Sequence, residues 1–126
     1  MSQIQRDYGD RGFRLVAVNA NDAETHPSDS FDEMQARAAE QSFAFDYLQD
    51  PEQSLARALG SKRTPEVFLF DAGRRLVYHG AIDDNRDETA VSQTYLRDAI
   101  EATLAGAPPD PADTPPVGCT VKWKAR

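Results

Sequence analysis

The sequence predicts an α/β domain in which a mixed sheet is flanked by helices. Helix-like and strand-like segments alternate along the first half of the chain, and two strand-like segments then follow one another across a short turn. The chain has 126 residues, of which 40% are hydrophobic and 28% charged. That length and balance suit a globular domain with one core.

The N-terminal segment predicts a short helix followed by a strand. Ile4 and Tyr8 lie four residues apart and glycines follow them, so residues 2–9 have the pattern of a helix end. Residues 13–19 (FRLVAVN) are rich in β-branched and apolar side chains, which indicates a buried strand.

The next segment contains a second helix and a short strand. Ser30 and Glu33 have the spacing of a capping box, in which the serine accepts from the third backbone amide of a helix that would continue to about Gln41. In residues 43–47, aromatic side chains alternate with small or polar ones, so we expect a half-buried strand there.

A third helix is predicted between Asp50 and Gly60. Asp50 would cap it, Pro51 would occupy its first position, and Gln53 would supply a reciprocal cap. Gly60 is the type of residue that ends a helix in the left-handed conformation.

The C-terminal half predicts a hairpin and a long helix. Residues 67–70 (VFLF) form an apolar run, typical of a strand buried on both faces, and residues 76–79 return after a turn. An amphipathic stripe over residues 88–105 predicts the final helix.

Five prolines lie between Pro108 and Pro116, so this segment should be extended. Apolar residues then alternate along 117–123, which suggests that the segment docks back on the protein. The expected organisation is therefore one domain at residues 1–107 and a proline-rich extension at 108–126.

Charge and cysteine content narrow the functional classes. The net charge of −7 argues against non-specific binding to nucleic acid or to an anionic membrane. No apolar run approaches the ~18 residues of a membrane span, and the first twelve residues are too polar for a signal peptide. Because Cys119 is the only cysteine, no intrachain disulfide can form, and we expect a cytoplasmic protein.

The stretch from Arg63 to Asp71 (RTPEVFLFD) places a proline two residues before the strand at 67–70. Pro65 cannot donate to a sheet, and it restricts Thr64 to extended geometry. The Thr64–Pro65 bond could simply give the strand a rigid start. Alternatively it is a cis bond that shapes an exposed backbone edge beside a surface groove.

Five stretches resemble successive landmarks of the thioredoxin-like redoxin family, which includes peroxide-reducing and thiol–disulfide exchange proteins. They cover nearly the whole chain: VAVNANDAETHPSDSF, YLQDPEQSLARALG, RTPEVFLFD, YHGAIDDN and PPVGCTVKWK. The resemblance implies a thioredoxin-like α/β fold. It also implies that Arg63, Thr64 and Pro65 bind substrate, as an edge that pairs with an extended segment.

One departure from the family pattern is large. The resemblance implies a reactive Cys-x-x-Cys at the start of a helix, where the helix N-terminus favours the thiolate. This sequence contains no such motif, so we expect an N-terminally incomplete version of the domain, lacking a central strand between residues 13–19 and 67–70. Their open edges favour a homo-oligomer, although direct pairing of the two strands and partial folding are alternatives.

Two interpretations remain open for Cys119. It alternates in phase with Val117, Val121 and Trp123, which favours a small buried hydrophobe. Its Gly-Cys setting near the C-terminus and the two lysines that follow it favour a resolving or peroxide-sensitive thiol. In the second interpretation Cys119 is the catalytic residue.

Other candidate sites have weaker patterns. His26 and His79 have no partner at ligand spacing, so surface or hydrogen-bonding roles are expected. Asp83, Asn85 and Asp87 begin like a calcium loop, but the glycine and the bidentate glutamate are missing. No phosphate-binding loop occurs. The sequence therefore predicts no cofactor and no metal.

The resemblance implies thiol–disulfide exchange or peroxide reduction, with a protein thiol, a protein disulfide or a peroxide as the partner. Since a dithiol cycle needs two thiols, we expect this chain alone to be inactive as a dithiol reductase. The alternative function is a non-catalytic module that binds a peptide or protein along the proline edge.

Overall fold

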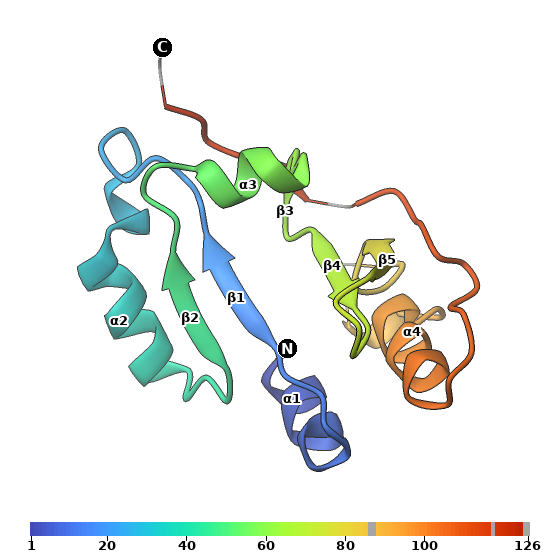
Figure 1. Ribbon diagram of the computed structural model, residues 1–126. Coiled ribbons are helices and arrows are strands. Elements are labelled where there is room, and N and C mark those ends of the chain that lie inside the picture. Colours follow the sequence, from blue (N-terminus) through green and yellow to red (C-terminus); the bar gives the residue numbers. More distant parts are fainter. Residues whose placement is uncertain (86–87, 117, 125–126) are drawn as a thin grey trace. The chain divides into compact units, whose positions relative to one another are not determined.

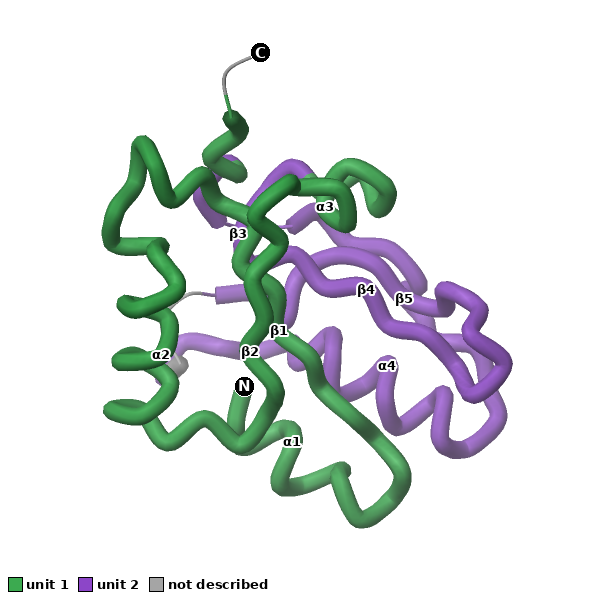
Figure 2. The backbone as a smooth tube through the Cα atoms, turned by 60° about the vertical axis from the view of Figure 1, so that its left-hand side comes forward, with its two compact units in different colours: residues 1–61, 121–126 green, residues 62–120 purple. Residues whose placement is uncertain are grey.

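The computed structural model describes residues 1–85, 88–116 and 118–124. It divides into two units, Met1–Ser61 with Val121–Arg126, and Lys62–Thr120 (Figure 2). Helices and strands are mixed in both units, as the sequence predicts. The strands of the described residues form three two-stranded pairs, one parallel and two antiparallel.

The described residues of the first unit form a parallel strand pair and three α-helices, whose arrangement is shown in Figure 1. Its elements are α1 (Ser2–Tyr8), β1 (Val16–Asn19), α2 (Phe31–Glu40), β2 (Asp46–Gln49) and α3 (Ser54–Leu59), with 3-10 turns at Gly9–Arg11 and Pro27–Asp29. Strand β1 pairs with β2, and α2 lies beside β2. The buried apolar side chains of this unit are Ile4, Tyr8, Met34, Ala56 and Val121.

The second unit is an antiparallel hairpin packed against one helix. Its elements are β3 (Arg63–Thr64), β4 (Val67–Phe70), β5 (Leu76–Gly80), a 3-10 turn (Glu88–Ala90), α4 (Tyr95–Leu104) and β6 (Cys119–Thr120). Strands β4 and β5 form the predicted hairpin, and α4 lies along it (Figure 1). Its core consists of Leu69, Tyr78, Ala81, Leu96, Ala99 and Ile100.

Two local capping signals identify helix ends correctly, whereas the predicted start of α3 at Asp50 and Pro51 is wrong, because α3 begins at Ser54 with Gln53 at the N-cap position. The Ser30 hydroxyl accepts a hydrogen bond from the Glu33 amide at 3.2 Å, which confirms the predicted start of α2. Gly60 ends α3 with a φ of 70°, so the predicted glycine stop is also confirmed. Both signals depend on residues that are near one another in sequence, and for this reason they can be recognised without the fold.

Two predicted elements differ from the structure in their bounds. The strand expected at 43–47 is displaced to Asp46–Gln49, because the rings of Phe43, Phe45 and Tyr47 pack on one another. The helix expected over 88–105 begins only at Tyr95. Before it, the Asp84 carboxylate accepts from the Ser92 amide, and the Asp84 amide donates to the Gln93 carbonyl, so Ser92 and Gln93 are bonded to Asp84 and do not begin the helix.

The prediction that 67–70 is buried on both faces is wrong. Leu69 is buried, but the side chain of Phe70 is 47% exposed. Helix α4 packs against the hairpin, whose two strands pair only with one another among the named strands of the described residues. A long apolar run therefore indicates a strand here, although it does not determine how many of its faces are covered.

Gln53 has a role different from the predicted reciprocal cap. The backbone of Gln53 has the left-handed conformation, with a φ of 61°, and its side chain is fully buried. The amide nitrogen donates to the carbonyls of Ala20 at 2.7 Å and Lys122 at 2.9 Å, while the amide oxygen accepts from the Lys124 backbone. Gln53 thus joins the residue that follows β1, the start of α3 and the C-terminal segment of the first unit.

We expect Gln53→Met to lower the free energy of unfolding by about 2–4 kcal/mol, because the change keeps the side-chain length and leaves buried backbone groups without partners. Urea denaturation followed by the fluorescence of Trp123 would measure this. The matched control is Gln35→Met on the exposed face of α2, which should change the free energy by less than about 0.5 kcal/mol. Equal effects of the two changes would contradict this role of Gln53.

Candidate functional site

The proline edge predicted from the sequence pairs with the C-terminal segment of its own chain. Strands β3 and β6 are antiparallel, with Arg63 opposite Thr120 and Thr64 opposite Cys119. Gly118 permits this approach, since a Cβ at that position would lie 2.2 Å from the Thr64 carbonyl oxygen. The pairing places the thiol-bearing residue of the chain beside the predicted substrate-binding residues.

The predicted site residues all lie at the surface of the second unit. Arg63, Thr64 and Pro65 are exposed, and the Thr64–Pro65 bond is cis. Cys119 is a free, exposed cysteine. Its interpretation as a buried hydrophobe is therefore wrong. The alternating residues at 117–123 do not share one buried face, because Val121 is buried whereas Cys119 is exposed. Val117 lies outside the described residues.

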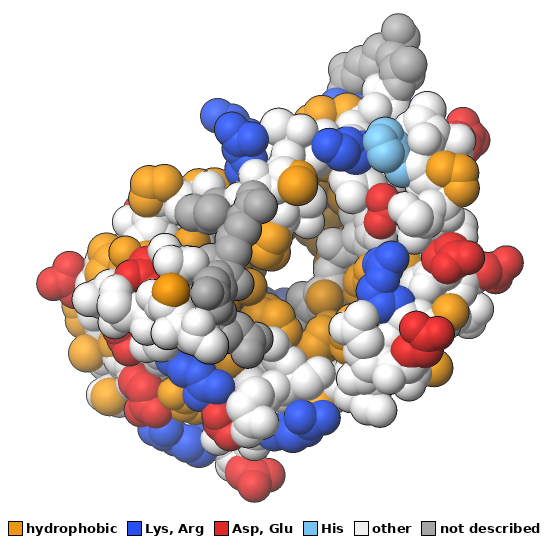
Figure 3. All heavy atoms as spheres, turned by 180° about the vertical axis from the view of Figure 1, so that it is seen from behind, with side chains coloured by type: hydrophobic (Ala, Val, Ile, Leu, Met, Phe, Trp, Pro, Cys, Tyr) orange, Lys and Arg blue, Asp and Glu red, His pale blue; other side chains and the backbone are white. Residues whose placement is uncertain are grey.

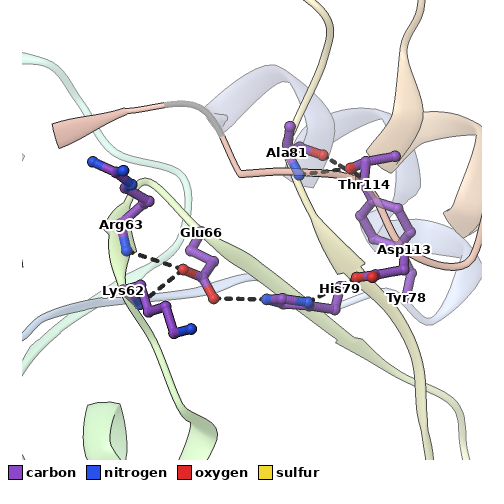
Figure 4. A network of polar contacts seen from close by, with 8 residues as sticks. All are labelled: Lys62, Arg63, Glu66, Tyr78, His79, Ala81, Asp113 and Thr114. Carbon is purple, nitrogen blue, oxygen red and sulfur yellow. Dashed lines mark hydrogen bonds and ion pairs between the residues drawn. The ribbon is translucent and has the colours of Figure 1, made fainter. Parts of the chain in front are cut away.

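Glu66 organises the turn that carries this edge (Figure 4). Its side chain is only 2% exposed, and one carboxylate oxygen accepts the backbone amides of Lys62 and Arg63, both at 3.0 Å. The other oxygen contacts Nε2 of His79 at 2.6 Å. Burial acts to raise the pKa of Glu66, but the hydrogen bonds from His79 and the two amides outweigh burial and hold it below its ordinary value.

His79 lies between two carboxylates. Its Nε2 contacts Glu66, its Nδ1 contacts Asp113 at 2.9 Å, and its ring stacks on Phe68 with centroids 4.8 Å apart. The hydrogen bond to Glu66 raises the pKa of His79, burial opposes this, and the hydrogen bond to Asp113 raises it further. The sequence predicted a hydrogen-bonding role for His79, but neither carboxylate partner.

The segment around Asp113 is fixed to β5 by backbone and side-chain bonds. The His79 amide donates to the Ala112 carbonyl, and the Thr114 amide donates back to His79, both at 3.0 Å. The Thr114 hydroxyl accepts from the Ala81 amide and bonds the buried Tyr78 hydroxyl at 2.7 Å. The prolines at 108–116 therefore belong to a segment that docks within the second unit.

The remaining sequence candidates lie elsewhere. His26 contacts the neighbouring hydroxyl of Thr25, and Asp83 accepts from the Asn85 amide in a local turn. Asp87, the third residue of the calcium-like pattern, is outside the described residues. Within the part of the chain that the structure describes, no group of three or more His, Cys, Asp or Glu side chains is placed to hold a metal.

Comparison with known families identifies the chain. The Redoxin family model matches residues 1–95, which include β3, Pro65 and His79. The chain belongs to the Redoxin family. Thioredoxin-family redox function in general terms follows from this membership, whereas Cys119 and Asp113 lie beyond the matched residues.

Two solved structures are similar over nearly the whole redoxin chain. A hypothetical protein from Sinorhizobium meliloti 1021 is 38% identical with a TM-score of 0.92; the match covers 99% of this chain and 69% of that one. An uncharacterized conserved protein from Geobacillus kaustophilus is 36% identical with a TM-score of 0.91, covering 99% and 67%. No curated protein matches the sequence. The fold is thioredoxin-like α/β, as predicted.

The surface of this redoxin chain carries side chains of both charges. On the face in Figure 3, acidic and basic side chains are interspersed, and hydrophobic side chains are visible between them. Among the described residues, the structure has no helix that combines the length and the apolar character needed to span a bilayer.

Proposed function

We propose that this redoxin chain performs thiol-based redox chemistry through Cys119, with Arg63, Thr64 and Pro65 contacting the substrate. The observation that supports this most directly is the antiparallel pairing of Thr64 with Cys119, which holds an exposed thiol beside an exposed proline edge. Membership in the Redoxin family supports the same chemistry. We propose a cytoplasmic setting, where thiols are kept reduced.

The proposed reaction uses one thiol of this chain and thiols from other molecules. With a peroxide, the Cys119 thiolate attacks one oxygen and the O–O bond breaks, so that Cys119 becomes a sulfenic acid and the leaving oxygen takes a proton from solvent to depart as an alcohol or water. A thiol from a partner then displaces water and forms a mixed disulfide. A second partner thiol attacks the partner's sulfur of that disulfide, which releases the partner disulfide and restores the Cys119 thiol.

With a disulfide substrate the same thiolate attacks sulfur instead of oxygen. One substrate thiolate leaves, and the other sulfur stays on Cys119 as a mixed disulfide until an external thiol resolves it. The thiol that resolves this mixed disulfide must come from another molecule, because this chain has one cysteine. Arg63 and Thr64 would hold the substrate close to the reacting sulfur.

A non-catalytic binding module is the second candidate function. The observation that favours it is that β3 already accepts an extended antiparallel segment, its own β6. An extended peptide from another protein could use the same backbone groups by strand addition after displacing β6. This function needs the edge but does not need the sulfur of Cys119.

Oxidation of Cys119 tests the catalytic proposal. Under dilute peroxide we expect a sulfenic acid at Cys119, detectable by mass spectrometry after dimedone trapping, and peroxide consumption that depends on an added thiol. Without an added thiol, insulin reduction should stay at the rate of a Cys119→Ala control, because one thiol cannot complete a dithiol cycle.

The controls separate the two candidate functions. Cys119→Ser keeps a small polar side chain at β6 and should lose all peroxide consumption. A chain without thiol-dependent turnover that still binds an extended peptide would favour the binding module. Insulin reduction clearly faster than that of Cys119→Ala in the absence of an added thiol would contradict the one-thiol mechanism.

A further inference from the structure

The Glu66–His79–Asp113 cluster connects three segments that are far apart in the sequence (Figure 4). Glu66 precedes β4 and binds the amides of the turn before the proline edge. His79 belongs to β5, and Asp113 belongs to the segment that leads toward Cys119. One imidazole thus joins the turn of the proline edge to the segment that docks on β5.

The protonation state of His79 decides how many of these contacts can be hydrogen bonds. An ionised carboxylate only accepts, so bonds to both Glu66 and Asp113 require hydrogen on both ring nitrogens, which is the charged form. A neutral imidazole has one donor and can keep only one of them. Because the Glu66 side chain is 2% exposed and that of Asp113 is 77% exposed, the bond to Asp113 is the one that water replaces.

We propose that His79 is a proton-operated latch that holds the segment at Ala112–Thr114, and with it the thiol-bearing strand β6, in the docked position. In the charged state the latch is closed. In the neutral state the ring presents a lone pair to the Asp113 carboxylate, the contact becomes repulsive, and the segment opens more often. The inference depends on the proposed function only in that the segment carries Cys119.

No other charged side chain that the structure describes is shown in contact with the ring. Strand β4 contributes the uncharged ring of Phe68. Lys62 and Arg63 contribute backbone amides to Glu66. Tyr78, the neighbour of His79 in β5, projects to the opposite face and contacts Thr114 through its buried hydroxyl.

The direction of the pH effect follows from the raised pKa of His79, for which the Glu66 hydrogen bond is the largest cause. The latch stabilises the docked segment fully below the ordinary histidine pKa of about 6.5. This stabilisation is lost as the pH rises through the higher value of the folded protein. Docking should therefore weaken as the pH rises above the ordinary histidine range.

Amide hydrogen exchange measured by NMR tests the latch. We expect the protection factors of the Thr114 and Ala81 amides, corrected for intrinsic rates, to fall about three- to tenfold as His79 loses its proton, since one charge-assisted bond is lost. Amides that pair β4 with β5 should keep constant protection and serve as the internal reference. Using Cys119→Ser protein removes any effect of oxidation.

Matched variants identify the titrating group. His79→Gln should have the lower protection at every pH, and His26→Gln, which changes the other histidine, should titrate like the parent protein. Asp113→Asn should lose the pH dependence without losing protection, because an amide can donate to the neutral ring. Asp110→Asn removes the same charge from the same segment and should leave the pH dependence intact.

Protection of Thr114 that is independent of pH in the parent protein would overturn the latch, as would an unchanged titration in Asp113→Asn. The exposed position of Asp113 keeps this second test valid even if His79→Gln does not fold. The outcome is separate from that of the proposed function. If the protection of the Thr114 amide changes with pH but Cys119 never oxidises, only the catalytic role of Cys119 is refuted.

Discussion

Gly118→Ala is expected to detach β6 from β3 while leaving the Cys119 thiol chemically unchanged. The new methyl group would lie 2.2 Å from the Thr64 carbonyl oxygen and 2.8 Å from its carbonyl carbon. Backbone atoms cannot rotate away as a side chain would. Such overpacking costs about 1–3 kcal/mol, whereas a ladder of two residues gains only about 0.5–1.5 kcal/mol per hydrogen bond.

The separation of the strands should be visible in two measurements. Exchange of the β3 and β6 amides should accelerate by about tenfold or more. Thiol-dependent turnover should fall by a similar factor, because Cys119 is no longer held beside Arg63, Thr64 and Pro65. Alkylation of Cys119 by a small reagent should continue, since this reaction needs only an exposed thiol.

Gly73→Ala is the matched control for the added methyl group. Its new Cβ would meet Asp71 Oδ1 at 3.3 Å, and a side chain can adjust by that amount. Exchange of the β3 and β6 amides should be unchanged in this variant. If Gly118→Ala kept both the pairing and full turnover, the close approach of β6 to β3 would not be what positions the thiol.

Self-association at micromolar concentration is the second large expected effect. Strand β1 pairs with β2 on one edge, and β2 is its only strand partner among the described residues. Val16, Val18 and Leu48 leave 38–51% of their area exposed on the same face of this pair. An open edge beside exposed apolar side chains favours pairing with a second copy.

Val18→Lys should shift the protein toward the monomer and raise the dissociation constant by about tenfold or more, because an edge lysine disfavours strand pairing between copies. Light scattering over a range of concentrations measures the change. Leu55→Lys on α3 is the control, with the same charge change at a residue of similar exposure away from the sheet. A monomeric parent protein would show that this edge does not mediate association.

Short-range signals in the sequence were reliable because their causes are local. The Ser30 cap, the Gly60 stop and the hairpin of β4 with β5 depend on residues within a few positions of one another. The family could be recognised for a related reason, since several such segments occur in a fixed order. The resemblance also directed attention to Thr64 and Pro65 as an edge.

The sequence alone determined the α/β class, the Redoxin family, the presence of a single cysteine and the proline before the strand at 67–70. Only the tertiary structure decided that Cys119 is exposed and paired opposite Thr64, since an alternating pattern defines two faces without saying which one is covered. It also decided that Glu66 and Asp113 meet at His79. Hydrogen bonds between residues 13 and 34 positions apart depend on the path of the whole chain, which no local spacing records.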